Sequence, residues 1–165
     1  MPTGLDDLIA LARGTAARHA LEPALICAVV EQESAWDAHA IRYEPGFRTR
    51  YVAPLVLPPT EEIARSISWG LMQVMGQVAR EHGFTGKFLS ALCEPAAGLD
   101  IGCAVLTAKL TIRSGSSSRE SSPGRTTEGS LSAAPGDIAR VLQLWNGGAN
   151  PNYAAEVLAR MARYK

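Results

Sequence analysis

Residues Glu22 to Asp37 read EPALICAVVEQESAWD, and this stretch decides how the rest of the chain can fold. The pattern predicts a helix with Glu22 at the N-cap and Pro23 at the first helical position, where no backbone N–H is needed. At about 100° per residue, one face of this helix is apolar and consists of Ile26, Val29 and Val30, with Leu25 at its edge. We therefore expect this face to point into the core.

Two acids on this helix point in different directions. Glu33 falls near the middle of the apolar stripe, whereas Glu31 points almost the opposite way and is predicted to face solvent. An ionised carboxylate on a core-facing stripe is costly unless it is paired or protonated, and a raised pKa suits a general acid near neutral pH. The alternative is that the helix ends near Glu33, so that its carboxylate reaches water.

The composition is that of a globular domain without excess charge. The chain has 165 residues, of which 47% are hydrophobic, and 16 Lys plus Arg balance 16 Asp plus Glu. This length suits a single domain with one core, predicted to span residues 1–165. A net charge of zero argues against nucleic-acid binding and provides no bulk positive field, so a polyanionic substrate would have to be held by local contacts.

The cysteines argue against a disulfide or metal protein, and the N-terminal residues argue against a signal peptide. Cys27, Cys93 and Cys103 have no metal-ligand spacing with a histidine, and an odd number of cysteines is not a disulfide framework. We expect buried thiols, no disulfide, no metal and no cofactor. The opening residues, MPTGLDDL, lack a basic region followed by an apolar run, so the sequence predicts neither a signal peptide nor a membrane span.

Helical periodicity recurs along most of the chain. The predicted helices are residues 5–18, the 22–37 stretch, a short helix with its N-cap at Thr60 that ends near Ser66, residues 68–81, a helix opened by Pro95, a helix capped by Asp137, and residues 153–164. Gly83 is predicted to be the glycine that ends the helix at 68–81, just beyond its C-cap. No alternating strand pattern is apparent, so the predicted fold class is all-α.

Two long segments interrupt the predicted helices. The first, between Arg42 and Pro59, is rich in aromatic residues, Pro and Gly, and is predicted to be irregular or extended. Loops of this length are often functional, although packing by its own aromatic residues is an equal alternative. The second, residues 114–136, is rich in Ser and Gly and cannot bury enough apolar surface to offset its ordering entropy, so it is predicted to be a flexible surface loop within the domain.

Three separated motifs occur in the order and rough spacing of one enzyme family. They are Glu33-Ser34, Gly70-Leu71-Met72-Gln73 and Trp145-Asn146-Gly147-Gly148. Together they resemble the soluble lytic transglycosylases, a lysozyme-like family related to the goose-type lysozymes. The resemblance covers nearly the whole chain except residues 43–67 and the Ser-rich loop. It implies a lysozyme-like helical domain that cleaves peptidoglycan.

The resemblance makes Glu33 the single catalytic acid and base. It implies that Glu33 protonates the glycosidic oxygen between N-acetylmuramic acid and N-acetylglucosamine, and that it then helps the muramoyl 6-hydroxyl attack the anomeric carbon. The product would be a 1,6-anhydro sugar, formed without the second carboxylate that most glycosidases use. Asp37 is expected to face solvent. Glu44 is the other carboxylate expected near the cleft, and a structural or solvated role suits it better than a catalytic one.

The remaining residues of the first two motifs are expected to support the acid or bind sugar. Ser34 would hydrogen-bond to Glu33 or to a sugar, unless it makes only a local backbone bond. Gly70 would let the backbone approach the sugar closely. Met72 would contact the sugar beside the scissile bond, or else fill the core. Gln73 offers a donor and an acceptor to an N-acetyl group or to Glu33.

Aromatic and amide side chains complete the expected substrate site. Asn146 could hydrogen-bond to sugar or to the loop of the glycine motif, and Trp69 and Tyr43 could stack on sugar or simply pack. Trp145 stands where the family usually has a tyrosine whose hydroxyl lies near the acid, and an indole N–H can donate but cannot accept. Gly76 replaces a proline that usually follows the second motif, which changes only helix geometry.

The sequence leaves two other functions open. A hydrolytic muramidase or chitinase on the same fold would need a second carboxylate to activate water. An inactive glycan-binding module would fit the tryptophan at position 145. We expect a monomer that binds a peptidoglycan strand. Because no signal peptide is predicted, we expect a phage-type lysis protein or the cargo of a cell-puncturing machine, made in the cytoplasm and released to the wall by a holin or a delivery machine.

Overall fold

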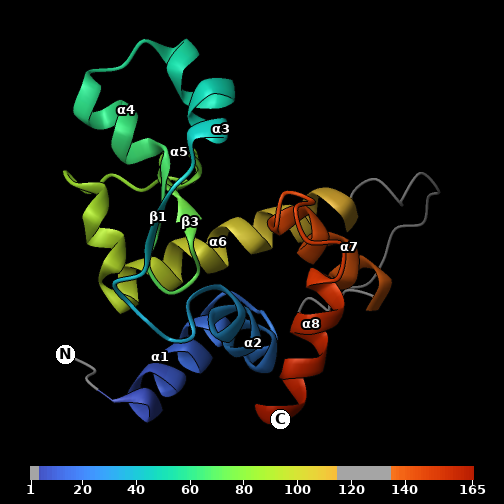
Figure 1. The fold of residues 1–165 in the computed structure, drawn as a ribbon. Helices are drawn as coiled ribbons and strands as arrows, with labels where there is room; N and C mark the ends of the chain where they lie inside the picture. Colours follow the sequence, from blue (N-terminus) through green and yellow to red (C-terminus); the bar gives the residue numbers. More distant parts are fainter. Residues whose placement is uncertain (1–3, 115–134) are drawn as a thin grey trace, which may run out of the picture.

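The computed structural model describes residues 4–114 and 135–165 and is mostly helical (Figure 1). The longer helices are α1 (Leu5–Arg18), α2 (Pro23–Ser34), α6 (Pro95–Ser114), α7 (Pro135–Trp145) and α8 (Tyr153–Arg160). The shorter helices are α3 (Pro45–Phe47), α4 (Pro59–Arg65) and α5 (Gly76–Glu81), and the strands are β1 (Ile41–Tyr43), β2 (Ile67–Trp69) and β3 (Val74–Met75). This architecture confirms the predicted all-α, lysozyme-like fold class.

Helix α2 lies inside the fold, with α1 and α8 packed against it (Figure 1). As predicted, Glu22 is its N-cap and Pro23 is its first residue. Every residue from Ala24 to Val30 is buried, so the helix is covered all round and is not amphipathic. Full burial of a Val or Ile side chain stabilises the fold by about 1.5–3 kcal/mol. The surrounding core includes Ala12, Ala16, Leu99, Leu106, Val141, Leu142 and Val157.

The expectation that Glu31 faces solvent is wrong. Its carboxylate is half-buried and accepts hydrogen bonds from the Arg163 guanidinium and, at 2.8 Å, from the Tyr164 hydroxyl. Arg13 in turn donates to the backbone carbonyl of Tyr164 at 2.5 Å, which fixes the same segment on α1. The helical wheel predicted exposure because it cannot show that the C-terminal segment packs on this side of α2.

A three-stranded antiparallel sheet, in the order β1-β2-β3, replaces most of the helix predicted for residues 68–81. Ile41 pairs with Trp69 in the first ladder, and Trp69 pairs with Val74 in the second. Gly70 and Gln73 have φ values of 67° and 49°, which reverse the chain between β2 and β3 and cannot occur inside an α-helix. The prediction holds only for the second half of the segment, where α5 begins at Gly76.

The segment predicted as irregular contains short elements. After β1 come α3, a π-helical turn (Arg48–Val52) and a 3₁₀ turn (Ala53–Leu55). Helix α4 then begins at Pro59, after an N-cap at Pro58 and not at Thr60, and ends before Ser66 as predicted. An ion pair of 2.7 Å between Arg48 and Glu62 fixes the π-helical turn on α4.

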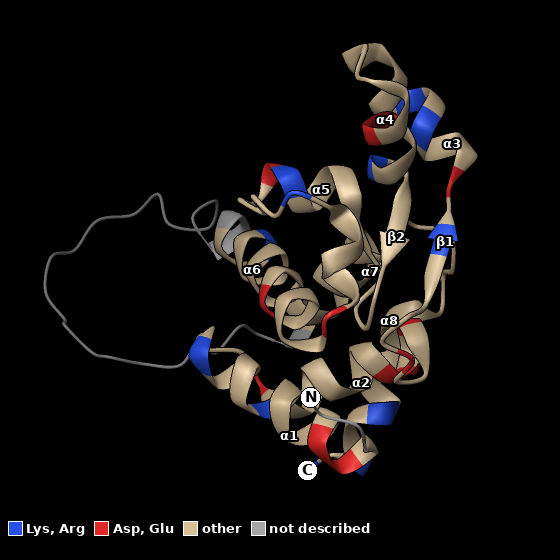
Figure 2. Cartoon of the chain, turned by 90° about the vertical axis from the view of Figure 1, so that its left-hand side faces the viewer, with Lys and Arg blue, Asp and Glu red and all other residues tan. Residues whose placement is uncertain are grey.

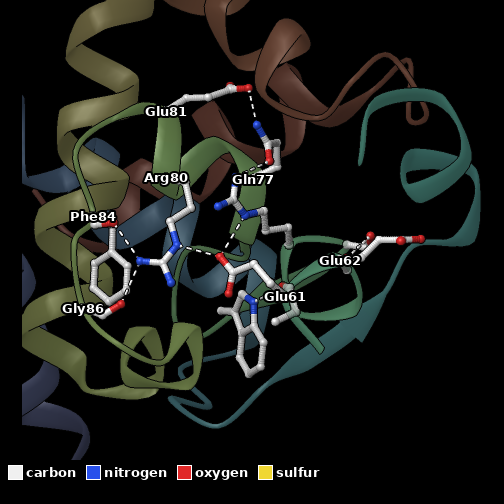
Figure 3. Close-up of polar contacts among 11 residues, drawn as sticks. Glu61, Glu62, Gln77, Arg80, Glu81, Phe84 and Gly86 are labelled. Carbon is white, nitrogen blue, oxygen red and sulfur yellow. Dashed lines mark hydrogen bonds and ion pairs between the residues drawn. The ribbon is translucent and has the colours of Figure 1, made fainter. Parts of the chain in front are cut away.

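A charged network fixes α4 on α5 (Figure 3). Glu61 Oε1 accepts hydrogen bonds from Arg65 Nε at 2.8 Å and from Arg80 Nε at 3.0 Å. Arg80 also donates to the backbone carbonyls of Phe84 and Gly86 at 3.0 and 2.7 Å. This network connects the upper lobe of the molecule, which contains α3 and α4, with the part that carries α5.

The C-terminal helices differ from their predicted bounds by a few residues. Helix α7 begins at Pro135, so Asp137 lies in its first turn and not at its cap. Helix α8 ends at Arg160, and a 3₁₀ turn (Met161–Arg163) follows it. Gly83 has a φ of 90° just after α5, as expected of a C-terminal glycine. The predicted Ser-rich loop lies outside the described residues except at its two ends.

The thiols are buried to different degrees. Cys27 and Cys103 are fully buried, whereas Cys93 is half-buried. Burial raises the pKa of all three thiols, that of Cys103 to about 12, so these groups are poor nucleophiles. Within residues 4–114 and 135–165, no helix combines the length and the apolar character needed to cross a membrane, and no cluster of three metal-ligating side chains occurs.

Candidate active site

A groove of about 750 Å³ runs beside the C-terminal end of α2. Its lining comes from the end of α2, β1, the α3 segment, the β2–β3 hairpin, α5, α6, α7 and the loop after α7. Figure 1 shows where these elements lie in the fold. The lining residues used below are Glu33, Arg42, Glu44, Phe47, Arg50, Tyr51, Gln73, Lys109, Trp145 and Asn146. Residues from all three sequence motifs therefore meet at one groove.

The Glu33 carboxyl is held by two donors on the same oxygen. The Tyr153 hydroxyl donates to Glu33 Oε1 at 2.5 Å, and the indole N–H of Trp145 donates to it at 3.1 Å. No donor among the described residues contacts Glu33 Oε2. One oxygen is therefore anchored to the protein, while the other has no partner within the described parts of the chain.

Burial raises the pKa of Glu33 above its ordinary value, because a charged carboxylate is poorly solvated here. The hydrogen bonds from Tyr153 and Trp145 and the positive charge of Arg42 oppose this rise without cancelling it. The pKa of Tyr153 is also raised, by its burial and by the Glu33 charge, so its hydroxyl stays a donor. The carboxyl is thus shifted towards its neutral form, in the direction a general acid requires.

Local backbone geometry places Glu33 at the groove. Helix α2 ends at Ser34, and Ala35 and Trp36 have φ values of 49° and 68°, so the chain turns away directly after the acid. The Ser34 hydroxyl lies 2.9 Å from the carbonyl of Leu71 and 3.1 Å from that of Val30, and can donate to either. Ser34 therefore ties the last turn of α2 to the turn between β2 and β3, and its hydroxyl makes these backbone bonds in place of the expected bond to Glu33.

Gln73 lines the groove, but its amide bonds to the protein's own backbone and to Ser68. Its Nε2 donates to the carbonyls of Ala40 and Gly70, both at 2.9 Å, and its Oε1 accepts from the Ser68 hydroxyl at 2.8 Å. These bonds hold the left-handed backbone of Gln73 in the turn between β2 and β3. Both N–H donors of the Gln73 amide are thus engaged, and its Oε1 already accepts one hydrogen bond.

A comparison with protein-family models matches residues 10–122 to the transglycosylase SLT domain. The matched part is more than half of the chain and includes Glu33 and the glycine motif. This chain belongs to the transglycosylase SLT family. Comparisons with curated proteins and with solved structures gave no match. The family assigns the domain a peptidoglycan substrate and a function of the lytic transglycosylase type.

Three predicted sugar contacts of the SLT domain lie in its interior. Gly70 is buried, and a Cβ there would come within 2.4 Å of the Leu92 carbonyl oxygen, so its close approach is to the protein's own backbone. Met72 is fully buried and packs against Gly102, which is the core-filling alternative. Trp69 is buried and donates to the Ala64 carbonyl at 3.0 Å. None of the three lines the groove.

The other predicted residues lie at the groove or its edge. Glu44 lines it and forms an ion pair of 2.6 Å with Arg42. Asn146 also lines it, and its side-chain oxygen, assigned from the hydrogen-bond network, accepts from the backbone N–H of Asn150 at 2.6 Å. Asn146 thereby shapes the loop after α7. Tyr43 is 43% exposed on β1 and lies outside the lining.

Sequence reasoning missed Tyr153 and the groove cations. Tyr153 lies 120 positions after Glu33 and beyond the residues that match the family model, where it reads as the first apolar residue of an amphipathic helix. Its signal was its place just after the Asn-Gly-Gly loop that follows Trp145. Arg42 and Arg50 belong to the segment predicted as a possible functional loop, but no pattern singled them out.

Proposed function

We propose that this SLT domain is a peptidoglycan lytic transglycosylase in which Glu33 is the single acid and base. The observation that carries the proposal is the asymmetric anchoring of its carboxyl at the groove. Oε1 accepts from Tyr153 and Trp145, so in the neutral acid the proton resides on Oε2. That oxygen has no partner among the described residues and is the one available to a substrate.

In the first step, Glu33 Oε2 donates its proton to the glycosidic oxygen between N-acetylmuramic acid and N-acetylglucosamine. The bond from the anomeric carbon to that oxygen breaks, and the N-acetylglucosamine side leaves as an alcohol. In the second step, the Glu33 carboxylate accepts the proton of the muramoyl 6-hydroxyl while this oxygen bonds to the anomeric carbon. Glu33 is protonated again, the product is the 1,6-anhydro sugar, and no water is consumed.

Tyr153 and Trp145 support the first step because proton donation turns Glu33 into a carboxylate. Hydrogen bonds to a charged acceptor are stronger than those to a neutral one, so both donors stabilise the state that forms. An indole in place of the family's usual tyrosine still supplies a donor. This geometry favours an active enzyme over an inactive glycan-binding module.

The second candidate is a hydrolase on the same groove, which the position of Glu44 favours. Most hydrolytic glycosidases use two carboxylates, and Glu44 is the other acid of the groove lining within the described residues. Its ion pair of 2.6 Å with Arg42 orients the Glu44 carboxylate directly after β1, which suits a structural role better than the activation of water.

Purified peptidoglycan tests the proposal. We expect the protein to lower the turbidity of a wall suspension and to release fragments with 1,6-anhydro ends, each lighter by one water than a hydrolytic fragment. Glu33→Gln keeps an acceptor oxygen for Tyr153 and Trp145 but cannot transfer the proton, so the rate should fall by about 10²–10⁴-fold. Reducing ends in place of anhydro ends would establish the hydrolase, and unchanged lysis by Glu33→Gln would refute the role of the acid.

We also propose that the protein acts at the cell wall as a monomer, after release by a holin or a delivery machine. The peptidoglycan substrate supports the place of action. Cells that express the chain alone should stay intact, and cells that also express a holin should lyse. Lysis at the same rate without a holin would contradict this route.

A further inference from the structure

The groove has a charge balance that differs from that of the chain. The chain has a formal net charge of zero, and Figure 2 shows Lys and Arg interspersed with Asp and Glu along the ribbon. The groove lining instead contains the cations Arg42, Arg50 and Lys109 against the carboxyls of Glu33 and Glu44. When Glu33 is protonated, as the first step requires, this balance leaves two positive charges.

The excess charge resides on Arg50 and Lys109. Arg42 is paired with Glu44 at 2.6 Å, and it is also the groove cation close enough to oppose the raised pKa of Glu33. Within residues 4–114 and 135–165, no Asp or Glu lies within ion-pair distance of Arg50 or Lys109. The guanidinium of Arg50 lies 5.2 Å from the ring centroid of Tyr51, which is a contact with a neutral group.

The same turn provides an internal comparison. Arg48 and Arg50 both belong to the π-helical turn. Arg48 forms an ion pair of 2.7 Å with Glu62, whereas Arg50 lines the groove. Lys109 comes from α6, far away in sequence, and is half-buried. Two cations from separate elements thus converge on one groove without a carboxylate partner among the described residues. A ligand with its own carboxylates would supply the missing partners.

We infer that Arg50 and Lys109 bind the carboxylates of the peptide stems carried by the glycan strand. This inference rests on the proposed function, because the substrate it names is that of the same groove. N-acetylated sugars are neutral, and the lactyl group of each muramic acid is bound in an amide, so the free carboxylates of the substrate belong to its stems. Phe47 and Tyr51, whose ring centroids lie 4.9 Å apart, offer an apolar surface to the neutral sugars on the same wall.

Binding to two forms of the same walls tests the inference without needing activity. The probes are purified sacculi and the same sacculi with their carboxylates converted to amides by carbodiimide and ammonium chloride. In a Glu33→Gln background, co-sedimentation gives the apparent affinity for each form. Adding Arg50→Gln and Lys109→Gln should weaken binding to native sacculi about tenfold, since two partly exposed ion pairs are lost. It should leave binding to amidated sacculi unchanged.

Lys87→Gln and Arg140→Gln form the matched control, because both side chains are exposed and lie outside the groove lining. This pair should bind both forms of sacculi as the background does, and thermal unfolding should confirm that every variant is folded. Equal losses from the control pair and the groove pair, or a groove pair that binds native sacculi normally, would overturn the inference.

The two proposals fail differently. If the unmutated protein releases no fragments but binding depends on Arg50, Lys109 and the stem carboxylates, then the lytic function fails and the stem contact stands. If it releases anhydro fragments but binding ignores amidation, then the stem contact fails and the lytic function stands.

Discussion

Tyr153→Phe is the sharpest test of how the protein controls its acid. The change removes one hydroxyl that donates to Glu33 Oε1 at 2.5 Å and leaves the buried ring in place. A hydrogen bond to a charged acceptor contributes about 1.5–3 kcal/mol. Because Glu33 becomes a carboxylate as it protonates the leaving oxygen, that energy is lost from the transition state. We therefore expect kcat/KM to fall by about 10- to 100-fold.

The pH dependence of kcat/KM gives a second, independent test of the same hydrogen bond. The Tyr153 hydrogen bond lowers the pKa of Glu33 against the larger effect of burial, so removing it should raise that pKa further. A general acid works while it is protonated, and activity falls as the pH rises through its pKa. The alkaline limb of the kcat/KM profile should therefore move to higher pH in Tyr153→Phe.

Soluble glycan strands and mass detection of the products give the rates, and two further variants complete the design. Trp145→Phe removes the donor at 3.1 Å and should act in the same direction with a smaller effect. Tyr164→Phe is the matched control, because its hydroxyl donates to Glu31 at 2.8 Å and does not touch Glu33. An alkaline limb that moves to lower pH in Tyr153→Phe, or an equal rate loss in Tyr164→Phe, would refute the reasoning.

Further predictions concern stability. Gly70→Ala should lower the free energy of unfolding by about 2–5 kcal/mol, because alanine is strained at a left-handed φ and its Cβ would clash with the Leu92 carbonyl. Gly147→Ala has a similar φ but open space around the Cβ, so it should cost only about 1–2 kcal/mol. Urea unfolding measures both. Because burial raises the pKa of Glu33 in the folded state, the ionised Glu33 carboxylate lowers stability as the pH rises through that pKa. Glu33→Gln removes this charge, so it should raise Tm at neutral pH, and the gain should vanish in acid, where Glu33 is neutral in both states. Glu61→Gln should do the reverse, because Arg65 and Arg80 outweigh burial and lower the pKa of Glu61, so its contribution is lost as pH falls.

The helical framework was predictable because its signals are local. Pro23 and Pro95 open helices at the position where a missing N–H does no harm, and both predicted starts are confirmed. Gly83 similarly marks the end of α5. The helical wheel placed Glu33 on the apolar stripe but left a solvent-exposed carboxylate open, and the resemblance of the three motifs implied its role as the acid. The structure places Glu33 on the groove with its pKa raised.

The hairpin was missed because its strands have only two or three residues, too few to establish a period. Ile67, Ser68 and Trp69 alternate between apolar and polar and are followed by Gly70, but three residues fit a helix as well as a strand. Tyr153 was missed for another reason. Its contact with Glu33 depends on how the loop after α7 returns the chain to α2. The Asn-Gly-Gly sequence before Tyr153 indicates a turn there, but it does not show which residue the tyrosine contacts.

The three motifs meet at one groove, but their residues have different roles there: some contact the acid, and others hold the backbone beside it. Glu33 accepts a hydrogen bond from the Trp145 indole. Gln73 and Gly70 instead contact the protein's own backbone, at the carbonyls of Ala40 and Leu92 respectively. Ser34 joins the two parts, since its hydroxyl bonds to the carbonyl of Leu71 in the turn beside the acid. The second motif therefore positions the acid by building a rigid loop next to it. Substitutions there should lower stability and rate together, whereas those at Tyr153 and Trp145 should act on rate and pH profile.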